Sequence, residues 1–273
     1  MKHIVCFSGG HSSALVGIEV VRKYGAENVI FLNHDIAPHV EAEDIKRFKI
    51  EVADYCGVPI TYANHKNFPH VDQFDVTVKA KAFKVQNGQE LCTSRLKTEP
   101  FMKWLTENVE PDKATIYYGF DKGETTRIQR RAGIMAAHGY RTDYPLALWA
   151  KRSIQSTHEV GIKPPLTYGL FKHANCIGCL KAGKQHWYLT YIHRPDIWQK
   201  ARYAEDVIGY SIIKDVYLEE LEDMFEKMKQ AGIETTEHED GRTFFARAKA
   251  VLSQTEQLVF AFDSSNKPCE CVI

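Results

Sequence analysis

The stretch that decides the fold is His3-Ile4-Val5-Cys6-Phe7-Ser8-Gly9-Gly10-His11-Ser12-Ser13, close to the start of the chain. Residues 3–7 form a short apolar run that ends in Ser-Gly-Gly, a pattern typical of a buried strand. Residues 12–24 then carry apolar side chains at helical spacing, and Gly25 follows where a helix would stop. The opening of the chain therefore predicts a strand, a glycine turn and a helix.

The same alternation continues along the chain. Residues 28–32 predict a second strand, residues 40–56 a second amphipathic helix and residues 59–63 a third strand. Strands and helices that alternate at this short spacing predict a parallel sheet with right-handed crossovers. We predict further strands at 114–119 and 141–146, and further helices at 97–108, 124–138, 151–161, 215–231 and 243–258.

The expected fold class is α/β, with a doubly wound, mostly parallel five-stranded sheet and a helical C-terminal part. Residues 1–165 would form the α/β domain, and residues 166–273 a cysteine-containing segment followed by helices. The boundary would lie between residues 165 and 200. Residues 64–96 are less regular, and we expect them to loop over the sheet edge where the strands' carboxyl ends meet.

The composition is that of an ordinary globular protein. The 273 residues include 35 basic and 35 acidic side chains, so no whole-protein field would attract nucleic acid or a membrane. The N-terminal apolar run is too short for a signal peptide, and no stretch has the apolar length of a membrane span. We therefore expect a cytoplasmic protein without a membrane partner. Reduced cysteines in that compartment favour metal binding or catalysis over disulfides.

The loop Ser8-Gly9-Gly10-His11-Ser12-Ser13 carries the first functional signal. It lies at a strand's carboxyl end, where open parallel sheets bind ligands. The glycines allow close approach of an anion, the serines can cap the helix, and the free N–H groups of the helix start favour negative charge. These features predict a phosphate-binding loop, and the alternative is a plain turn with a serine cap. The letters match neither a Walker loop nor a dinucleotide fingerprint.

Two further segments carry positive charge near predicted helix starts. Arg95 and Lys97 follow Leu91-Cys92-Thr93-Ser94, and cations there suit an anion bound between them. Gly119, at the end of the fourth predicted strand, allows close backbone approach. The segment after it contains Glu124, Thr125 and Arg127, and the guanidinium of Arg127 suits a phosphate, with Arg130 and Arg131 as weaker candidates. The alternatives are solvated helix surfaces.

The pair Cys176 and Cys179 can chelate one metal through both thiolates, act as a redox dithiol, or be close by chance. Metal is favoured because nothing upstream supplies a thioredoxin-like unit. Cys6 and Cys56 are most simply buried hydrophobes. Asn33 and Asp35, just past the second predicted strand, are candidates for contacts with a ribose or a base.

The motifs in this order resemble a known family. Ser-Gly-Gly-x-x-Ser after a strand is similar to the PP-loop of the adenine nucleotide α-hydrolase-like superfamily, which has a HUP-like fold. The four motifs over about residues 1–200 resemble the phosphoadenylyl-sulfate (PAPS) reductase family within it. The chain departs from the pattern at Ser12, where ATP-using members have Asp, and at Leu91, where sulfate-reducing members have a second cysteine.

The resemblance implies an adenine nucleotide, ATP or PAPS, as ligand and leaves a role for Mg²⁺ open. It implies that Lys97 and Arg127 neutralise charge at the α-phosphate or sulfate. The residues that it implies in nucleotide binding are Ser8, Gly9, Gly10, His11, Ser12, Ser13, Asn33, Asp35, Arg95, Gly119, Glu124 and Thr125.

The resemblance also implies that Cys92 joins Cys176 and Cys179 around a [4Fe–4S] cluster, with zinc as the alternative. Candidates for the fourth ligand are Cys269, Cys271, His173 and His186. The terminal Glu270-Cys271 resembles the Glu-Cys of reductase tails, so Cys271 is a candidate catalytic thiol. A cluster ligand, a sulfur carrier and a terminus without a role are the alternatives.

Three functions follow from these expectations. The first is ATP-dependent sulfur transfer assisted by an iron–sulfur cluster. The second is a PAPS or adenylyl-sulfate reductase that releases sulfite through Cys271. The third is a non-catalytic nucleotide sensor. The partners expected are a sulfur donor or thiol reductant and an acceptor, for which a nucleic acid would fit residues 64–96 and the basic segment 122–131. Oligomeric state is not readable.

Overall fold

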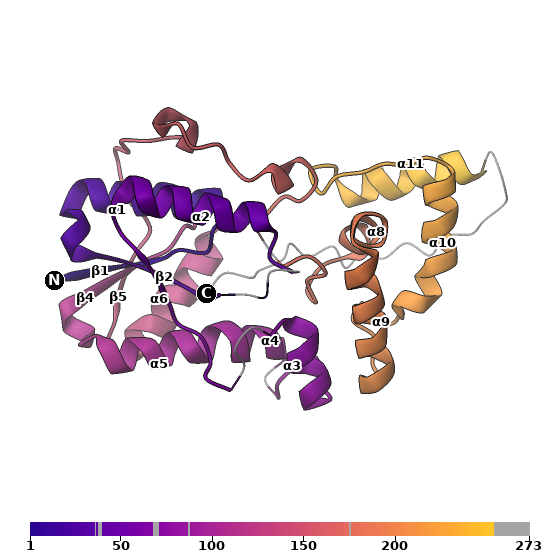
Figure 1. Ribbon diagram of the computed structural model, residues 1–273, viewed down its shortest axis with the longest axis horizontal. Coiled ribbons are helices and arrows are strands. Elements are labelled where there is room, and N and C mark those ends of the chain that lie inside the picture. Colours follow the sequence, from indigo (N-terminus) through magenta and orange to yellow (C-terminus); the bar gives the residue numbers. More distant parts are fainter. Residues whose placement is uncertain (36, 38–39, 68–70, 87, 175, 254–273) are drawn as a thin grey trace.

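The computed structural model describes residues 1–253, apart from residues 36, 38–39, 68–70, 87 and 175. Its five strands form one parallel sheet in the order β3-β2-β1-β4-β5 (Figure 1). The strands are β1 (Lys2–Cys6), β2 (Val29–Asn33), β3 (Ile60–Tyr62), β4 (Ala114–Tyr117) and β5 (Arg141–Asp143). The predicted α/β class and five-stranded parallel sheet are confirmed.

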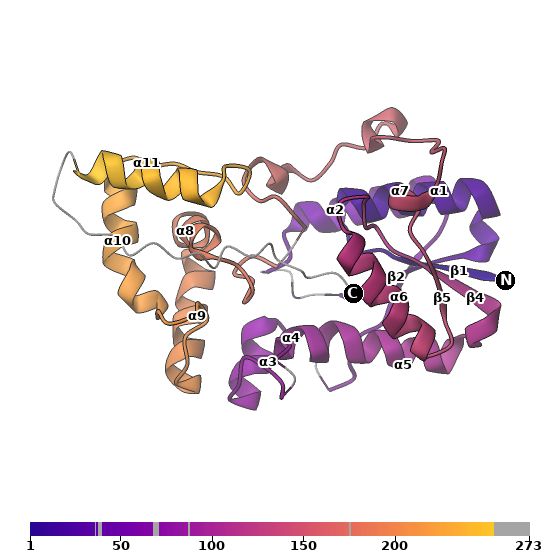
Figure 2. The same ribbon diagram turned by 180° about the vertical axis from the view of Figure 1, so that it is seen from behind.

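Alternation along β1 explains why helices cover both faces of the sheet. Val5 and Phe7 pack in one cluster with α1 (His11–Tyr24) and α2 (Glu43–Cys56). Ile4 and Cys6 point the other way, into a cluster with α5 (Glu99–Asn108) and α6 (Thr125–Ala137). Figures 1 and 2 show these two helix layers on opposite sides of the strands. The sheet is therefore doubly wound, as the sequence predicts.

The prediction of a helix at 151–161 is wrong. The structure has only a 3₁₀ turn, Thr157–Val160, which Ser156 caps and Gly161 ends at φ 77°. The amides of Ser153 and Ile154 donate to the buried carboxylate of Glu19 in α1 instead of to helical carbonyls. This tertiary contact overrides the local pattern.

Other boundaries differ by a few residues or more. Helix α2 begins at Glu43 instead of residue 40 and ends where Gly57 adopts a left-handed conformation. The helix predicted at 97–108 is the end of a longer run, which starts with α4 (Leu91–Thr93) and passes through a π-helical turn, Ser94–Thr98. Short elements complete this part: α7 (Pro145–Leu148) and the 3₁₀ turns Ala26–Asn28, Pro111–Lys113 and Leu166–Gly169.

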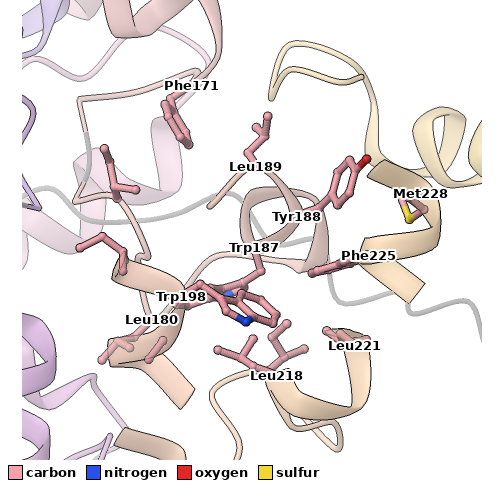
Figure 3. Close-up of a cluster of buried hydrophobic side chains, with 14 of the residues drawn as sticks. Phe171, Leu180, Trp187, Tyr188, Leu189, Trp198, Leu218, Leu221, Phe225 and Met228 are labelled. Atoms are coloured by element: carbon pink, nitrogen blue, oxygen red, sulfur yellow. The ribbon is translucent and has the colours of Figure 1, made fainter. Parts of the chain in front are cut away.

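Helices form the C-terminal part: α8 (Lys184–His193), α9 (Pro195–Ile208), α10 (Leu218–Gln230) and α11 (Gly241–Ser253). Their shared core contains Trp187, Trp198 and Phe225 (Figure 3). Helix α10 matches the prediction for 215–231, and α11 matches the described part of 243–258. The sequence did not predict α8 or α9. Residues 185–190 of α8 are all buried and show no amphipathic stripe.

The irregular stretch 64–96 contains an unpredicted helix, α3 (Gln73–Ala80), which Asp72 caps. Helix α3 lies beside α9 (Figures 1 and 2). Phe74 belongs to the core of the C-terminal helices, and Lys200 Nζ pairs with the carboxylates of Asp72 at 2.5 Å and Asp75 at 2.7 Å. Residues on both sides of position 165 thus share one core.

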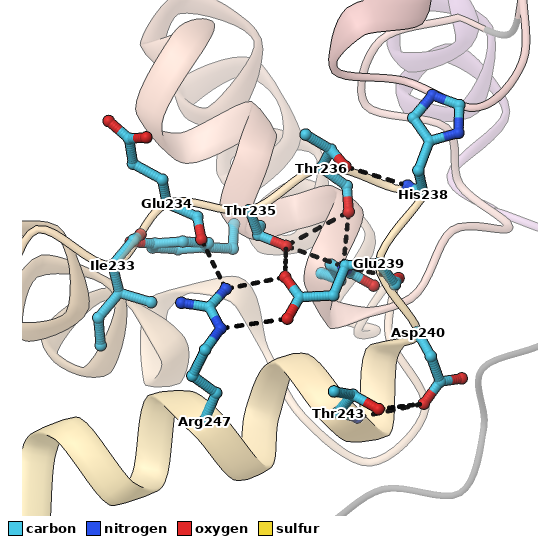
Figure 4. Close-up of polar contacts among 11 residues, drawn as sticks. Ile233, Glu234, Thr235, Thr236, His238, Glu239, Asp240, Thr243 and Arg247 are labelled. Atoms are coloured by element: carbon cyan, nitrogen blue, oxygen red, sulfur yellow. Dashed lines mark hydrogen bonds and ion pairs between the residues drawn. The ribbon is translucent and has the colours of Figure 1, made fainter.

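The loop before α11 fastens the C-terminal helices together. Arg247 of α11 pairs with Glu239 and also donates to the carbonyl of Glu234 at 2.8 Å (Figure 4). Two neighbouring loop residues point elsewhere, since Glu237 contacts His186 and His238 contacts the carbonyl of Tyr168.

None of the described helices is both long and apolar enough to cross a membrane.

Candidate functional site

The loop of residues 8–13 lies at the carboxyl end of β1, at the point where the strand order reverses between β1 and β4. Gly9 has φ 83°, and a Cβ there would lie 2.9 Å from side-chain atoms of Ile45 and Lys49. Only glycine fits this position. Open α/β sheets bind ligands in the crevice at this switch point.

Gly119, after β4, is pressed against the start of α1. A Cβ on Gly119 would lie 3.0 Å from the backbone nitrogen of Ser13 and 3.1 Å from the carbonyl carbon of Ser12. The structure therefore brings together two of the predicted nucleotide-binding segments, which are more than a hundred residues apart in the chain. Together they form the two sides of the switch point.

The serine hydroxyls shape the loop. Ser8 Oγ donates to Ser13 Oγ at 3.2 Å, and Ser13 Oγ donates to the carbonyl of Gly10 at 2.8 Å. Ser12, where the related pattern has Asp, is exposed. The first amides of α1 have no carbonyl within the helix to bind, so the N–H groups of Ser12 and Ser13 point out of its N-terminus. The loop offers backbone amides for an anion, and its two inner hydroxyls hold its shape.

Tyr168 is a site residue that sequence reasoning missed. Its hydroxyl oxygen accepts the N–H of His11 at 2.9 Å and would lie 3.3 Å from a Cβ on Gly10. Burial raises the pKa of the Tyr168 phenol, so the group keeps its proton at neutral pH and can donate it. Tyr168 lies in the run Pro165-Leu166-Thr167-Tyr168-Gly169, but only the fold reveals its contact with the loop. His11 also accepts the N–H of Thr157 at its Nε2, at 3.3 Å.

Four alternating charges lie beside the loop, from the segment after β2 and from α2. Asp35 pairs with Lys46 at 2.9 Å, and Glu41 pairs with Lys49 at 2.8 Å and with Lys46 at 3.9 Å. Lys49 is 1% exposed, and its stem carbons are those that a Cβ on Gly9 would meet. The amphipathic pattern of α2 gave no reason to single out Lys46 or Lys49, because lysines are common on solvated helix faces.

Asn33 is the last residue of β2 and His34 follows it, so both lie at the sheet edge that carries the loop 8–13. Asn33 Nδ2 donates to the carbonyl of Phe7, directly before the loop, so its amide nitrogen ties β2 to β1. His34 is buried, and its Nδ1 lies 2.5 Å from the carbonyl oxygen of Ala63, after β3. Asp35, the second residue predicted here, makes the ion pair with Lys46.

Arg95 and Lys97 lie in the π-helical turn, a rare conformation that recurs at functional sites. Arg95 pairs with Glu99 at 2.5 Å, and Glu99 also lies 3.9 Å from His65. Lys97 is half-buried, and its positive charge contributes to lowering the pKa of His34. The charge of Lys97 thus acts on His34 at the end of β2, whereas Arg95 pairs with Glu99 of the following helix.

Glu124, Thr125 and Arg127 form a compact cap at the start of α6. Glu124 accepts the N–H of Asp121 at 3.0 Å and pairs with Arg127. The guanidinium of Arg127 also lies 4.5 Å from the centroid of the Phe120 ring, and Thr125 Oγ1 donates to the carbonyl of Lys122 at 3.4 Å. The charge of Arg127 is thus balanced by Glu124.

The loop of Cys176 and Cys179 is fixed through its backbone. The carbonyls of Ile177 and Gly178 accept Gln73 Nε2 at 2.9 and 3.1 Å, and Gly178 has φ 70°. Lys181 pairs at 3.3 Å with Glu90, which directly precedes the helical run that carries Cys92. The fold thus joins the two cysteine-bearing segments that the sequence predicts to act together.

His186 does not act as a ligand in this arrangement. Its Nε2 accepts the N–H groups of Gly178 and Cys179 at 3.0 and 3.2 Å, and its Nδ1 donates to Glu237 at 2.5 Å. Both ring nitrogens are therefore used to hold the cysteine loop. The other candidate histidine, His173, is exposed.

Within the described part of the chain, no three or more His, Cys, Asp or Glu side chains are arranged to hold a metal ion. The metal centre therefore stays a prediction from the motifs, and we derive no reaction step through a metal. Cys269 and Cys271, including the proposed catalytic thiol, lie outside the described residues.

The chain has no match among protein-family models, curated proteins or solved structures. Its membership of the PAPS reductase family therefore stays a prediction from its motifs.

Proposed function

We propose that this protein binds an adenine nucleotide, ATP or PAPS, with the phosphates at the backbone amides of the loop 8–13. The observation that carries this proposal is the close approach of Gly119 to the first turn of α1. With no side chain at Gly119, the ends of β1 and β4 meet the first turn of α1 through bare backbone at the topological switch point. Helix amides and dipole favour a phosphate there, and the bare backbone permits close contact.

The reaction that we propose is ATP-dependent sulfur transfer. An acceptor oxygen would attack the α-phosphorus, and pyrophosphate would leave with the electron pair of the broken P–O bond. A sulfur nucleophile from a donor would then displace AMP from the activated acceptor. Lys97 supports this proposal, because its charge acts on His34 at the same sheet edge and a cation there can neutralise charge at the α-phosphate. The loop itself has a hydroxyl, Ser12, in place of the usual carboxylate, so it offers no acidic ligand to Mg²⁺.

Reduction of PAPS is a second candidate, which the terminal Glu270-Cys271 and Ser12 favour. A thiolate would attack the sulfur of the sulfonate, adenosine 3′,5′-bisphosphate would leave, and a thiol reductant would then release sulfite. The products separate the two reactions. Sulfur transfer yields AMP and pyrophosphate from ATP, whereas reduction yields sulfite from PAPS. Tight binding without either set of products would indicate a nucleotide sensor.

Gly119→Ala tests the site. The new Cβ would push against the Ser13 amide, so we expect at least a tenfold weaker affinity for ATP or PAPS by calorimetry. Gly133→Ala in α6 is the matched control, since a Cβ at Gly133 meets nothing within 4 Å. Equal affinities in two folded variants would contradict the site, and no nucleotide binding by the wild-type protein would overturn the proposed function.

We also propose that Cys92, Cys176 and Cys179 contribute ligands to a metal centre, for which the Glu90–Lys181 ion pair between their segments gives support. Iron, sulfide and zinc analysis of anaerobically purified protein tests the ligand set. Metal that is lost in Cys176→Ala but kept in Cys56→Ala supports it, since Cys56 is buried in α2. Anaerobically purified protein that contains no metal would contradict the proposed ligand set.

A further inference from the structure

His34 carries an acceptor atom that the protein itself leaves unpaired. The side chain is 3% exposed and lies directly after β2. Its Nδ1 is 2.5 Å from the carbonyl oxygen of Ala63, and a carbonyl can only accept, so Nδ1 carries the proton. The lone pair of the neutral ring is then on Nε2, which is buried and has no hydrogen-bond partner among the described residues.

The surroundings keep the ring neutral. Burial is the main cause that lowers the pKa of His34 to about 4; the hydrogen bond to Ala63 opposes this shift, and the charges of Lys97 and Lys49 contribute to it. At neutral pH Nε2 is therefore an acceptor and not a donor. A buried acceptor without a donor is costly, and native proteins pair nearly all such atoms with protein, water or a ligand.

His34 shares its sheet edge with the phosphate-binding loop. The N–H of Ala63 donates to the carbonyl of Asn33 at 2.8 Å, and the N–H of Phe7 donates to that of Leu32 at 2.9 Å. The ends of β1, β2 and β3 are thereby held in line. Lys49 lies near both the loop and His34. Its side-chain carbons are those that a Cβ on Gly9 would meet, and its charge contributes to lowering the pKa of His34.

We propose that His34 Nε2 recognises the nucleoside end of the bound nucleotide by accepting a hydrogen bond from it. The donor would be an N–H or O–H group, either the exocyclic amine of adenine or a ribose hydroxyl. Phosphate oxygens are excluded, because at neutral pH they are acceptors and cannot satisfy a lone pair. The nucleotide would then lie with its phosphates on the loop 8–13 and its nucleoside over the ends of β2 and β3. This inference rests on the proposed function.

Two substitutions test the roles of the two ring nitrogens of His34 separately. Asparagine places an amide nitrogen near the position of Nδ1, so His34→Asn keeps the donor to Ala63 and removes the acceptor. Glutamine places an amide oxygen near the position of Nε2, so His34→Gln keeps the acceptor and removes the donor. We expect the Kd for ATP to rise about tenfold in His34→Asn, the usual effect of losing one hydrogen bond in a site, and to change less in His34→Gln.

Nucleotide analogues give the decisive measurement. Purine riboside triphosphate lacks the exocyclic amine, and 2′-deoxy-ATP and 3′-deoxy-ATP each lack one hydroxyl. We expect one of these to bind the wild-type protein about tenfold more weakly than ATP, and to bind His34→Asn within about twofold of ATP. The analogue that behaves so identifies the donor.

The possible failures are distinguishable. If the wild-type protein binds ATP but all three analogues bind as tightly, or if the loss is the same in His34→Asn, the inference about His34 is wrong and the proposed function stands. If the wild-type protein binds no adenine nucleotide, the proposed function is wrong and the inference falls with it. Should His34→Asn not fold, the wild-type analogue series and His34→Gln, which should retain the discrimination, still decide the question.

Discussion

At the scale of single residues, the site is built by atoms that the sequence pattern does not mark. The glycine loop could be predicted because strand, glycines and helix follow one another in the chain. Tyr168 and Lys49 could not, because each reaches the loop only through the fold. The position of His34 beside Asn33 and Asp35 could be predicted, but its buried, unpaired Nε2 could not. Conversely, Arg127 and Arg95 were predicted as phosphate ligands, and the structure pairs them with Glu124 and Glu99 of their own segments.

Tyr168→Phe is the prediction at this scale. The substitution removes the acceptor of the His11 N–H and the only proton that the side chain could donate to a bound phosphate. We expect the free energy of unfolding to fall by about 1 kcal/mol and the affinity for ATP to fall severalfold. Chemical denaturation and calorimetry measure the two effects. Tighter ATP binding in Tyr168→Phe would mean that the phenol occupies the place of the phosphate instead of assisting it.

At the scale of elements, periodicity predicted α2 and α10, whose buried residues recur at helical spacing. It missed α8, in which residues 185–190 are all buried, and α3, which lies in an irregular stretch. It also missed α9, although that helix has one buried and one exposed face. The stretch 151–161 shows the opposite error, because the carboxylate of Glu19 takes the amides that a helix would need. The contacts of Glu19 and of α3 join distant parts of the chain, so they could not be predicted from local pattern.

Glu205 at the end of α9 gives a prediction about two elements. Its two carboxylate oxygens accept the N–H of Ile212 at 2.6 Å and the N–H of Leu218, at the start of α10, at 2.7 Å. Burial is the main cause that raises the pKa of Glu205 from 4.5 to about 7; the two accepted N–H groups oppose this shift, and the charges of Asp206 and Glu220 contribute to it. The folded protein then holds a proton between these pH values that the unfolded chain has released.

The stability contribution of this proton is present below about pH 4.5 and is lost as the pH rises through about 7. We therefore expect the free energy of unfolding to decrease over this window and to level off above it. Denaturation curves at several pH values, compared between the wild-type protein and Glu205→Gln, isolate the contribution. The same slope in both proteins would show that Glu205 is ionised in the fold throughout.

At the scale of the whole molecule, the sequence predicted the class, the sheet and its double winding. The alternation of strands and helices along the chain favours a parallel sheet with helices on both faces. The sequence did not predict that α3 would enter the core of the C-terminal helices, although Phe74 and Lys200 bind the two parts together. This packing places the cysteine loop beside α3, since Gln73 holds its carbonyls.

The central claim is that an adenine nucleotide binds at the switch point between β1 and β4. Amide hydrogen exchange of the wild-type protein, with and without saturating ATP or PAPS, tests it most directly. We predict that bound nucleotide slows amide exchange at residues 9–13 and 119–123. We expect little change in α9 and α10, because these helices belong to the C-terminal core and not to the sheet edge. Unchanged exchange at residues 9–13, or protection confined to α8–α11, would contradict the account.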